Sequence, residues 1–96
     1  MKPSQALQKH RDAILRIIAL HRGLCPRVYG SVARGEDVEG SDLDILIEVL
    51  PDADLFDLGA MHTELEALLG VAIDVKTLKE LPEASRARVL REARGI

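Results

Sequence analysis

The segment spanning residues 29–49 constrains the fold of this chain of 96 residues most, and it reads YGSVARGEDVEGSDLDILIEV. From residue 43 to residue 49, every odd position is aliphatic, whereas the even positions open with Asp42 and Asp44. This period of two predicts a β-strand with one buried face and two carboxylates together on the other. Gly30 and Ser31, which ten residues separate from Asp42, predict a tight turn.

Apolar periodicity and turn-forming residues predict the remaining elements. The predicted elements are a helix over 4–21, a strand over 27–29, a helical turn over 32–34, a helix over 54–69, a strand over 71–77 and a helix over 82–93. Gly23 is predicted to stop the first helix, while Asp54 and Gly70 are predicted to cap the helix between them. The chain therefore alternates helix and strand from end to end.

This order predicts an α/β (α+β) fold with a mixed, three-stranded sheet flanked by helices. The helical crossover between the last two strands makes them parallel if they are neighbours. Their starts then bring Asp42, Asp44 and Asp74 to one end of the sheet. The first strand delivers Gly30 to that same end only if it runs antiparallel to the second.

The composition predicts a single domain, residues 1–96, in the cytoplasm. Hydrophobic residues make up 47% of the chain, and no apolar run approaches the length of a membrane span. One cysteine, Cys25, fits a reducing compartment and is expected to be a small buried side chain. A net charge of -3 and 2% aromatic residues argue against direct binding of nucleic acid.

The paired carboxylates point to metal-assisted phosphate chemistry. Asp42 and Asp44 would repel each other unless a cation lay between them. Mg²⁺ suits such a pair, because it uses one or two carboxylates together with substrate phosphates. Asp74 could share a second ion or take the proton of an attacking hydroxyl group.

The Gly-Ser turn adds groups that suit a phosphate. Gly30 lets the backbone approach an anion closely, and Ser31 contributes a hydroxyl group. Arg34 either contacts phosphate or pairs with nearby Glu36 or Asp37. Each piece alone is typical of a solvated turn, so it is their joint placement that indicates a nucleotide site.

The pattern G-S-x10-D-x-D with a later aspartate resembles the nucleotidyltransferase superfamily that includes DNA polymerase beta. More closely, the chain is similar to the minimal nucleotidyltransferase (MNT) antitoxins that are paired with HEPN-domain toxins. The resemblance rests on GSVARGE, SDLDILIE, GVAIDVKTL and the basic ending ASRARVLREARG. It implies that Gly30 and Ser31 hold the triphosphate of ATP, and that Asp42, Asp44 and Asp74 form the Mg²⁺ and catalytic site.

The resemblance further implies transfer of AMP from ATP to a tyrosine of a HEPN ribonuclease toxin, which neutralises it. A small catalytic domain without an acceptor-binding domain also favours an acceptor that is itself a protein. Two alternatives stay open. One is an antitoxin that acts by binding alone, and the other is a nucleotidyltransferase that modifies a small molecule.

Overall fold

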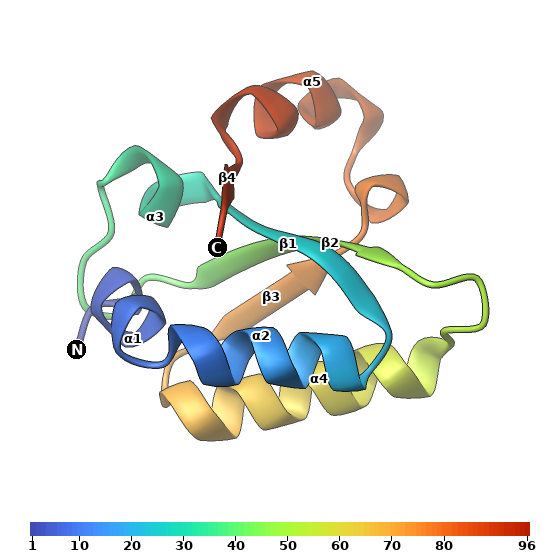
Figure 1. Cartoon of the computed structure of the whole chain (residues 1–96). Coiled ribbons are helices and arrows are strands. Elements are labelled where there is room, and N and C mark those ends of the chain that lie inside the picture. Colours follow the sequence, from blue (N-terminus) through green and yellow to red (C-terminus); the bar gives the residue numbers. More distant parts are fainter.

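The computed structural model describes all 96 residues, and a four-stranded sheet forms its centre (Figure 1). The strands are β1 (Gly23–Tyr29), β2 (Leu43–Val49), β3 (Ile73–Lys76) and β4 (Arg94–Gly95). The helices are α1 (Pro3–Lys9), α2 (Arg11–Leu20), α3 (Gly30–Arg34), α4 (Leu55–Leu69), the 3-10 turn η1 (Leu78–Glu80) and α5 (Glu83–Glu92).

The sheet is mixed, with strand order β3-β2-β1-β4. The strands β1 and β2 are antiparallel, whereas β2 and β3 are parallel. Both relationships are as the sequence predicts. The prediction of three strands is wrong by one, because the two-residue β4 adds antiparallel to the outer edge of β1.

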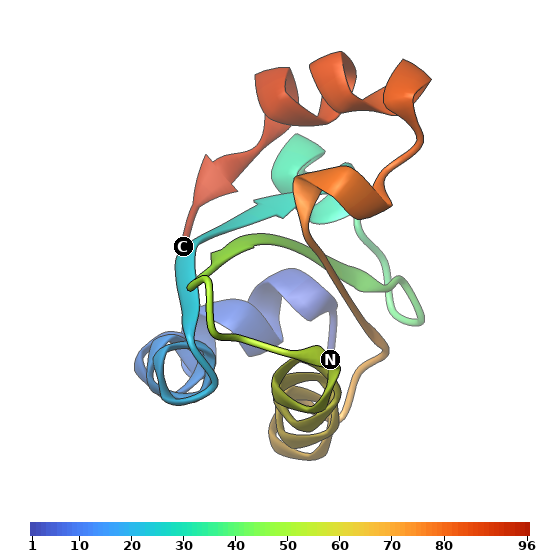
Figure 2. The ribbon, with the colours of Figure 1, turned by 90° about the vertical axis from the view of Figure 1, so that its right-hand side faces the viewer.

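Helices cover both faces of the sheet. The helices α2 and α4 lie side by side under one face, and α5 lies over the other (Figure 2). The larger core forms on the α2/α4 side, where the fully buried side chains include Ile14, Ile45, Met61 and Leu65. None of the helices has the length and apolar character needed to cross a membrane.

A second, smaller core lies beneath α5 and consists of Tyr29, Leu46, Leu81 and Val89. Leu46 occupies an even position of β2, on the face that the sequence pattern assigns to the carboxylates. It is 1% exposed because α5 covers that face. This packing fixes the last helix above the end of the sheet that carries Asp44.

The capping residues in the sequence predict both ends of α4 correctly. The Asp54 carboxylate accepts a hydrogen bond from the N–H of Asp57 at 3.0 Å and caps the first turn. Gly70 ends the helix in the left-handed conformation, with φ of 66°. The helix therefore begins and ends where the sequence predicts.

The N-terminal elements depart from the prediction. The single helix over 4–21 is two helices, because the backbone leaves helical geometry at His10. The first strand begins at Gly23, which is not a helix stop, and an irregularity between Leu24 and Arg27 interrupts its pairing. Cys25 lies in that irregularity with φ of 50° and is exposed, contrary to the expectation that it is buried.

Candidate active site

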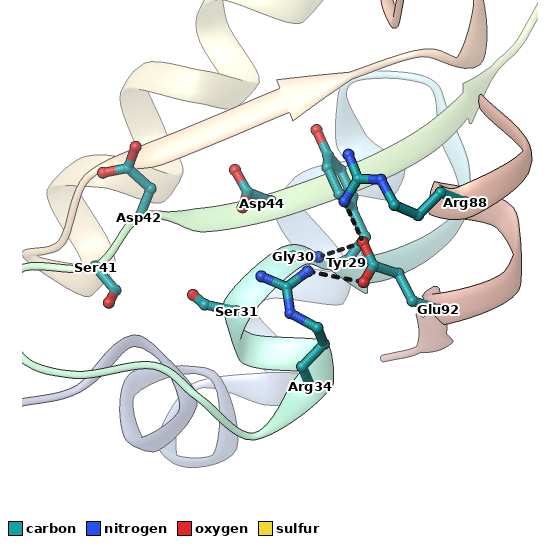
Figure 3. Close-up of a pocket in the computed structure, with 9 residues that line it drawn as sticks. All are labelled: Tyr29, Gly30, Ser31, Arg34, Ser41, Asp42, Asp44, Arg88 and Glu92. Atoms are coloured by element: carbon teal, nitrogen blue, oxygen red, sulfur yellow. Dashed lines mark hydrogen bonds and ion pairs between the residues drawn. The ribbon is translucent and has the colours of Figure 1, made fainter. Parts of the chain in front are cut away.

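A polar cavity of about 380 Å³ opens where β1, β2, α3 and α5 meet (Figure 3). Its lining combines carboxylates, guanidinium groups, hydroxyl groups and a glycine. The lining residues are Tyr29, Gly30, Ser31, Arg34, Ser41, Asp42, Asp44, Arg88 and Glu92. Five of the six site residues predicted from the sequence, all except Asp74, therefore line one cavity.

Gly30 occupies a position where any side chain would be strained. Its φ of 70° is left-handed, and a Cβ built there would collide with Oδ2 of Asp44. The absence of a side chain lets the turn from β1 into α3 pass directly against the carboxylate. The Gly-Ser turn therefore lies directly beside the start of β2.

Strand register aligns Tyr29, Asp44 and Asp74 across the sheet. Asp44 is the Cα partner of Tyr29 on β1 and of Asp74 on β3. Side chains at paired positions project from the same face of a sheet, so the three form one row. Asp42 lies two residues before Asp44 and is exposed at the mouth of the cavity (Figure 3).

The charge around Asp44 is negative and only partly balanced. Burial, followed by repulsion from Asp74 and Asp42, raises the pKa of Asp44 to about 6, although Arg34 acts in the opposite direction. Burial and the nearby carboxylates also raise the pKa of the Tyr29 hydroxyl group above its ordinary value. A cation bound at Asp42 and Asp44 would relieve this repulsion.

The donor set fits Mg²⁺ that arrives with phosphate groups. No three His, Cys, Asp or Glu side chains are arranged to hold a metal ion by themselves. Asp42 and Asp44 nevertheless supply the two carboxylates that Mg²⁺ commonly takes from a protein, and nucleotide phosphates supply further oxygens. These residues therefore match a metal–nucleotide complex better than a closed metal cage.

Asp74 stands apart from the other predicted site residues. It is next to Asp44 in the sheet but does not line the cavity. Its carboxylate lies 3.3 Å from the ammonium group of Lys76, two residues along β3. Asp74 is 41% exposed and faces the same side of the sheet as Asp44.

Arg34 is held by acidic partners from two elements. Its guanidinium group lies 3.5 Å from Glu36 and donates a hydrogen bond of 2.8 Å to Glu92 of α5. Asp37, the other partner considered from the sequence, is buried and accepts a hydrogen bond from the N–H of Ser4. Arg34 thus faces the cavity and is already paired there.

Sequence reasoning did not assign four lining residues, namely Tyr29, Ser41, Arg88 and Glu92. Tyr29 and Ser41 immediately precede predicted site residues, so a search of flanking positions could have found them. Arg88 and Glu92 lie on α5, at the far end of the chain. They enter the cavity only through tertiary packing, which leaves no local signal in the sequence.

A comparison with known protein families shows to which family the chain belongs. A nucleotidyltransferase domain model matches residues 26–95, which include the whole cavity. The chain belongs to the nucleotidyltransferase domain family. It is similar to MJ0435 of Methanocaldococcus jannaschii, an inferred protein adenylyltransferase, with 38% identity over 80 residues, 83% of this chain and 86% of the relative.

Solved structures agree with this assignment. A minimal nucleotidyltransferase is 40% identical, with a TM-score of 0.86 over 97% of this chain and 95% of the other. A toxin–antitoxin complex with AMP-PNP contains a chain of the same fold, with 16% identity, a TM-score of 0.74 and coverage of 88% of this chain and 69% of the other. The fold of this nucleotidyltransferase domain is therefore that of a minimal nucleotidyltransferase.

Proposed function

We propose that this nucleotidyltransferase domain is a cytoplasmic antitoxin that transfers AMP from ATP to a partner toxin. The toxin is of the HEPN ribonuclease class and binds the domain in a hetero-oligomer. The adenylyltransferase name of its M. jannaschii relative supports the reaction. A toxin–antitoxin complex with AMP-PNP contains a chain of the same fold, which supports a nucleotide substrate and a toxin as partner.

The observation that carries this proposal is the juxtaposition of Gly30, Asp42 and Asp44 at one cavity (Figure 3). Gly30 and Ser31 bind the triphosphate, and Arg34 contributes positive charge. Asp42 and Asp44 hold Mg²⁺, which neutralises phosphate charge and orients the nucleotide when it is bound. Asp74 lies beyond the cavity, on the side from which an acceptor can approach.

In the proposed reaction a hydroxyl oxygen of the acceptor, a tyrosine of the toxin, attacks the α-phosphorus of ATP. The new bond joins that oxygen to phosphorus, the bond between the α-phosphorus and its bridging oxygen breaks, and pyrophosphate leaves. Asp74 accepts the hydroxyl proton through its exposed carboxylate, which Lys76 pairs with at 3.3 Å. The remaining task of the site is to position and neutralise charge, as in other phosphoryl transfers.

Labelled ATP tests the class of acceptor. The domain, Mg²⁺ and ATP labelled at the α-phosphate are incubated separately with a candidate partner protein, such as the product of a neighbouring gene, with RNA and with an aminoglycoside. Label on the protein alone is the expected result. Label on RNA ends or on the aminoglycoside would overturn the protein-acceptor assignment, and inhibition of an unlabelled toxin would identify an antitoxin that acts by binding alone.

A further inference from the structure

Glu92, the last residue of α5, places its carboxylate inside the cavity (Figure 3). Its side chain is 15% exposed, the lowest value among the acidic side chains that form ion pairs in this chain. Glu92 lies on a helix that follows all of the predicted nucleotide-site residues in the sequence. Its position therefore results from the packing of α5 over Leu46 and Tyr29.

Three donors of the cavity converge on this one carboxylate. The N–H of Gly30 donates to Oε1 at 3.3 Å, and Nη1 of Arg34 donates to Oε2 at 2.8 Å. The guanidinium group of Arg88 lies 3.6 Å from Oε1. Arg34 and Arg88 are the only basic residues in the lining, so Glu92 engages every positive charge that the cavity offers.

A carboxylate held this way imitates a phosphate group. It presents two oxygens to a guanidinium group and a backbone N–H, and both carboxylates and phosphates are recognised by such donors. Partial burial would raise the pKa of Glu92, but hydrogen bonds from Arg34 and Gly30 outweigh it and keep the pKa below its ordinary value. The group is therefore an anion at neutral pH.

We propose that Glu92 is an internal substitute for a nucleotide phosphate, which the triphosphate must displace from Gly30, Arg34 and Arg88. The inference rests on the proposed nucleotide site and adds two residues to it. Once Glu92 no longer pairs with Arg88, Arg88 binds the phosphate groups of the nucleotide. Glu92 opposes nucleotide entry and thereby sets the affinity for the triphosphate.

The charges that line the cavity explain why the triphosphate has to displace Glu92. The lining carries three carboxylates, Asp42, Asp44 and Glu92, against two guanidinium groups. Mg²⁺ at the two aspartates can offset their charge, whereas Glu92 would still face the incoming phosphates. Displacement removes the like charge from the phosphates and frees both arginines in one movement.

Calorimetric titration with Mg²⁺-pyrophosphate tests the displacement, because this probe carries phosphate charge but no base or sugar. Glu92→Gln keeps the size of the side chain but removes its charge, so it weakens the hold on Arg34 and Arg88. The variant should bind pyrophosphate about tenfold more tightly than the wild type. Glu83→Gln, at the exposed start of α5, is the matched control and should leave the affinity unchanged.

Thermal unfolding is a second measurement of pyrophosphate binding. It also shows whether the variant is less stable than the wild type. Without ligand, Glu92→Gln should unfold at a lower temperature than the wild type, because Arg88 loses its charged partner and Arg34 keeps only the more distant Glu36. Saturating Mg²⁺-pyrophosphate should raise its unfolding temperature by more than it raises that of the wild type.

Equal or weaker binding by Glu92→Gln, or no binding by either protein, would overturn the role given to Glu92. Weaker binding in particular would show that Glu92 orients the two arginines for substrate. The proposed function would survive these outcomes if wild-type protein still transferred AMP to its partner. Conversely, tighter pyrophosphate binding without any AMP transfer would support the role of Glu92 and reject the proposed function.

Discussion

Asp44 of β2 and Asp74 of β3 are Cα partners in the parallel pairing of their strands, which sets two carboxylates next to each other on one face of the sheet. Repulsion between them contributes to the raised pKa of Asp44. The sheet thus concentrates negative charge beside the cavity, which Arg34 and Lys76 balance only in part. A site that receives a cation with its substrate can tolerate this arrangement.

The first prediction concerns pH and stability without metal. Folding raises the pKa of Asp44 from 3.8 to about 6. Between these two pH values, the folded protein therefore retains a proton on Asp44 that the unfolded chain has lost. The contribution of Asp44 to stability therefore falls as pH rises from about 4 through about 6. In EDTA, the wild type should lose stability relative to Asp44→Asn over this interval, as denaturant titrations at a series of pH values would measure. A stability difference that does not vary with pH would contradict the raised pKa of Asp44.

The second prediction concerns metal-dependent nucleotide binding. The double variant Asp42→Asn/Asp44→Asn should bind ATP in Mg²⁺ on the order of 100-fold more weakly, because the carboxylates no longer anchor the cation between protein and phosphates. Calorimetry with Mg²⁺ and with EDTA measures this effect. Equal affinity of the wild type for ATP in both conditions would refute a metal-bridged site.

The third prediction separates the role of Asp74 from binding. Asp74 does not line the cavity, so Asp74→Asn should leave ATP affinity within about threefold of the wild type. Transfer should fall by roughly 10²–10⁴-fold, the usual range for loss of a general base. A binding titration paired with a labelled-ATP assay makes the comparison. Near wild-type transfer would remove Asp74 from catalysis.

The fourth prediction tests the close approach of the Gly-Ser turn to the carboxylate. Gly30→Ala should lower the free energy of unfolding by more than the ~1–2 kcal/mol expected for a side chain in the left-handed region, because its Cβ also collides with Asp44. Gly35→Ala is the control, since Gly35 has a similar φ of 73° and nothing within 4 Å of its Cβ position. Urea unfolding measures both variants. Equal losses of unfolding free energy would contradict a close approach of residue 30 to Asp44.

The strand β2 and the ends of α4 could be predicted closely because their signals are local. Alternation along Leu43–Val49 gives the strand, and Asp54 and Gly70 supply the caps through their own chemistry. The same pattern misassigned the environment of Leu46. It shows which residues share a face, but it does not show that α5 covers that face.

The features that the sequence did not reveal depend on distant contacts. Two residues, Arg94 and Gly95, are too few to carry a strand pattern, and they pair because α5 returns the chain to the edge of β1. Arg88 and Glu92 lie in the basic ending ASRARVLREARG, but neither residue carries a pattern that points to the cavity. Their place in the cavity emerges only when α5 packs against the sheet and α3.

The most direct test of the central claim is the intact mass of the partner after incubation with this domain, ATP and Mg²⁺. The domain is supplied far below the concentration of the partner, so that stoichiometric binding cannot account for the outcome. Catalytic adenylylation predicts that nearly all of the partner gains whole AMP units, and that Asp42→Asn abolishes the gain. A partner that keeps its original mass while its activity is inhibited only by equimolar domain would contradict the account.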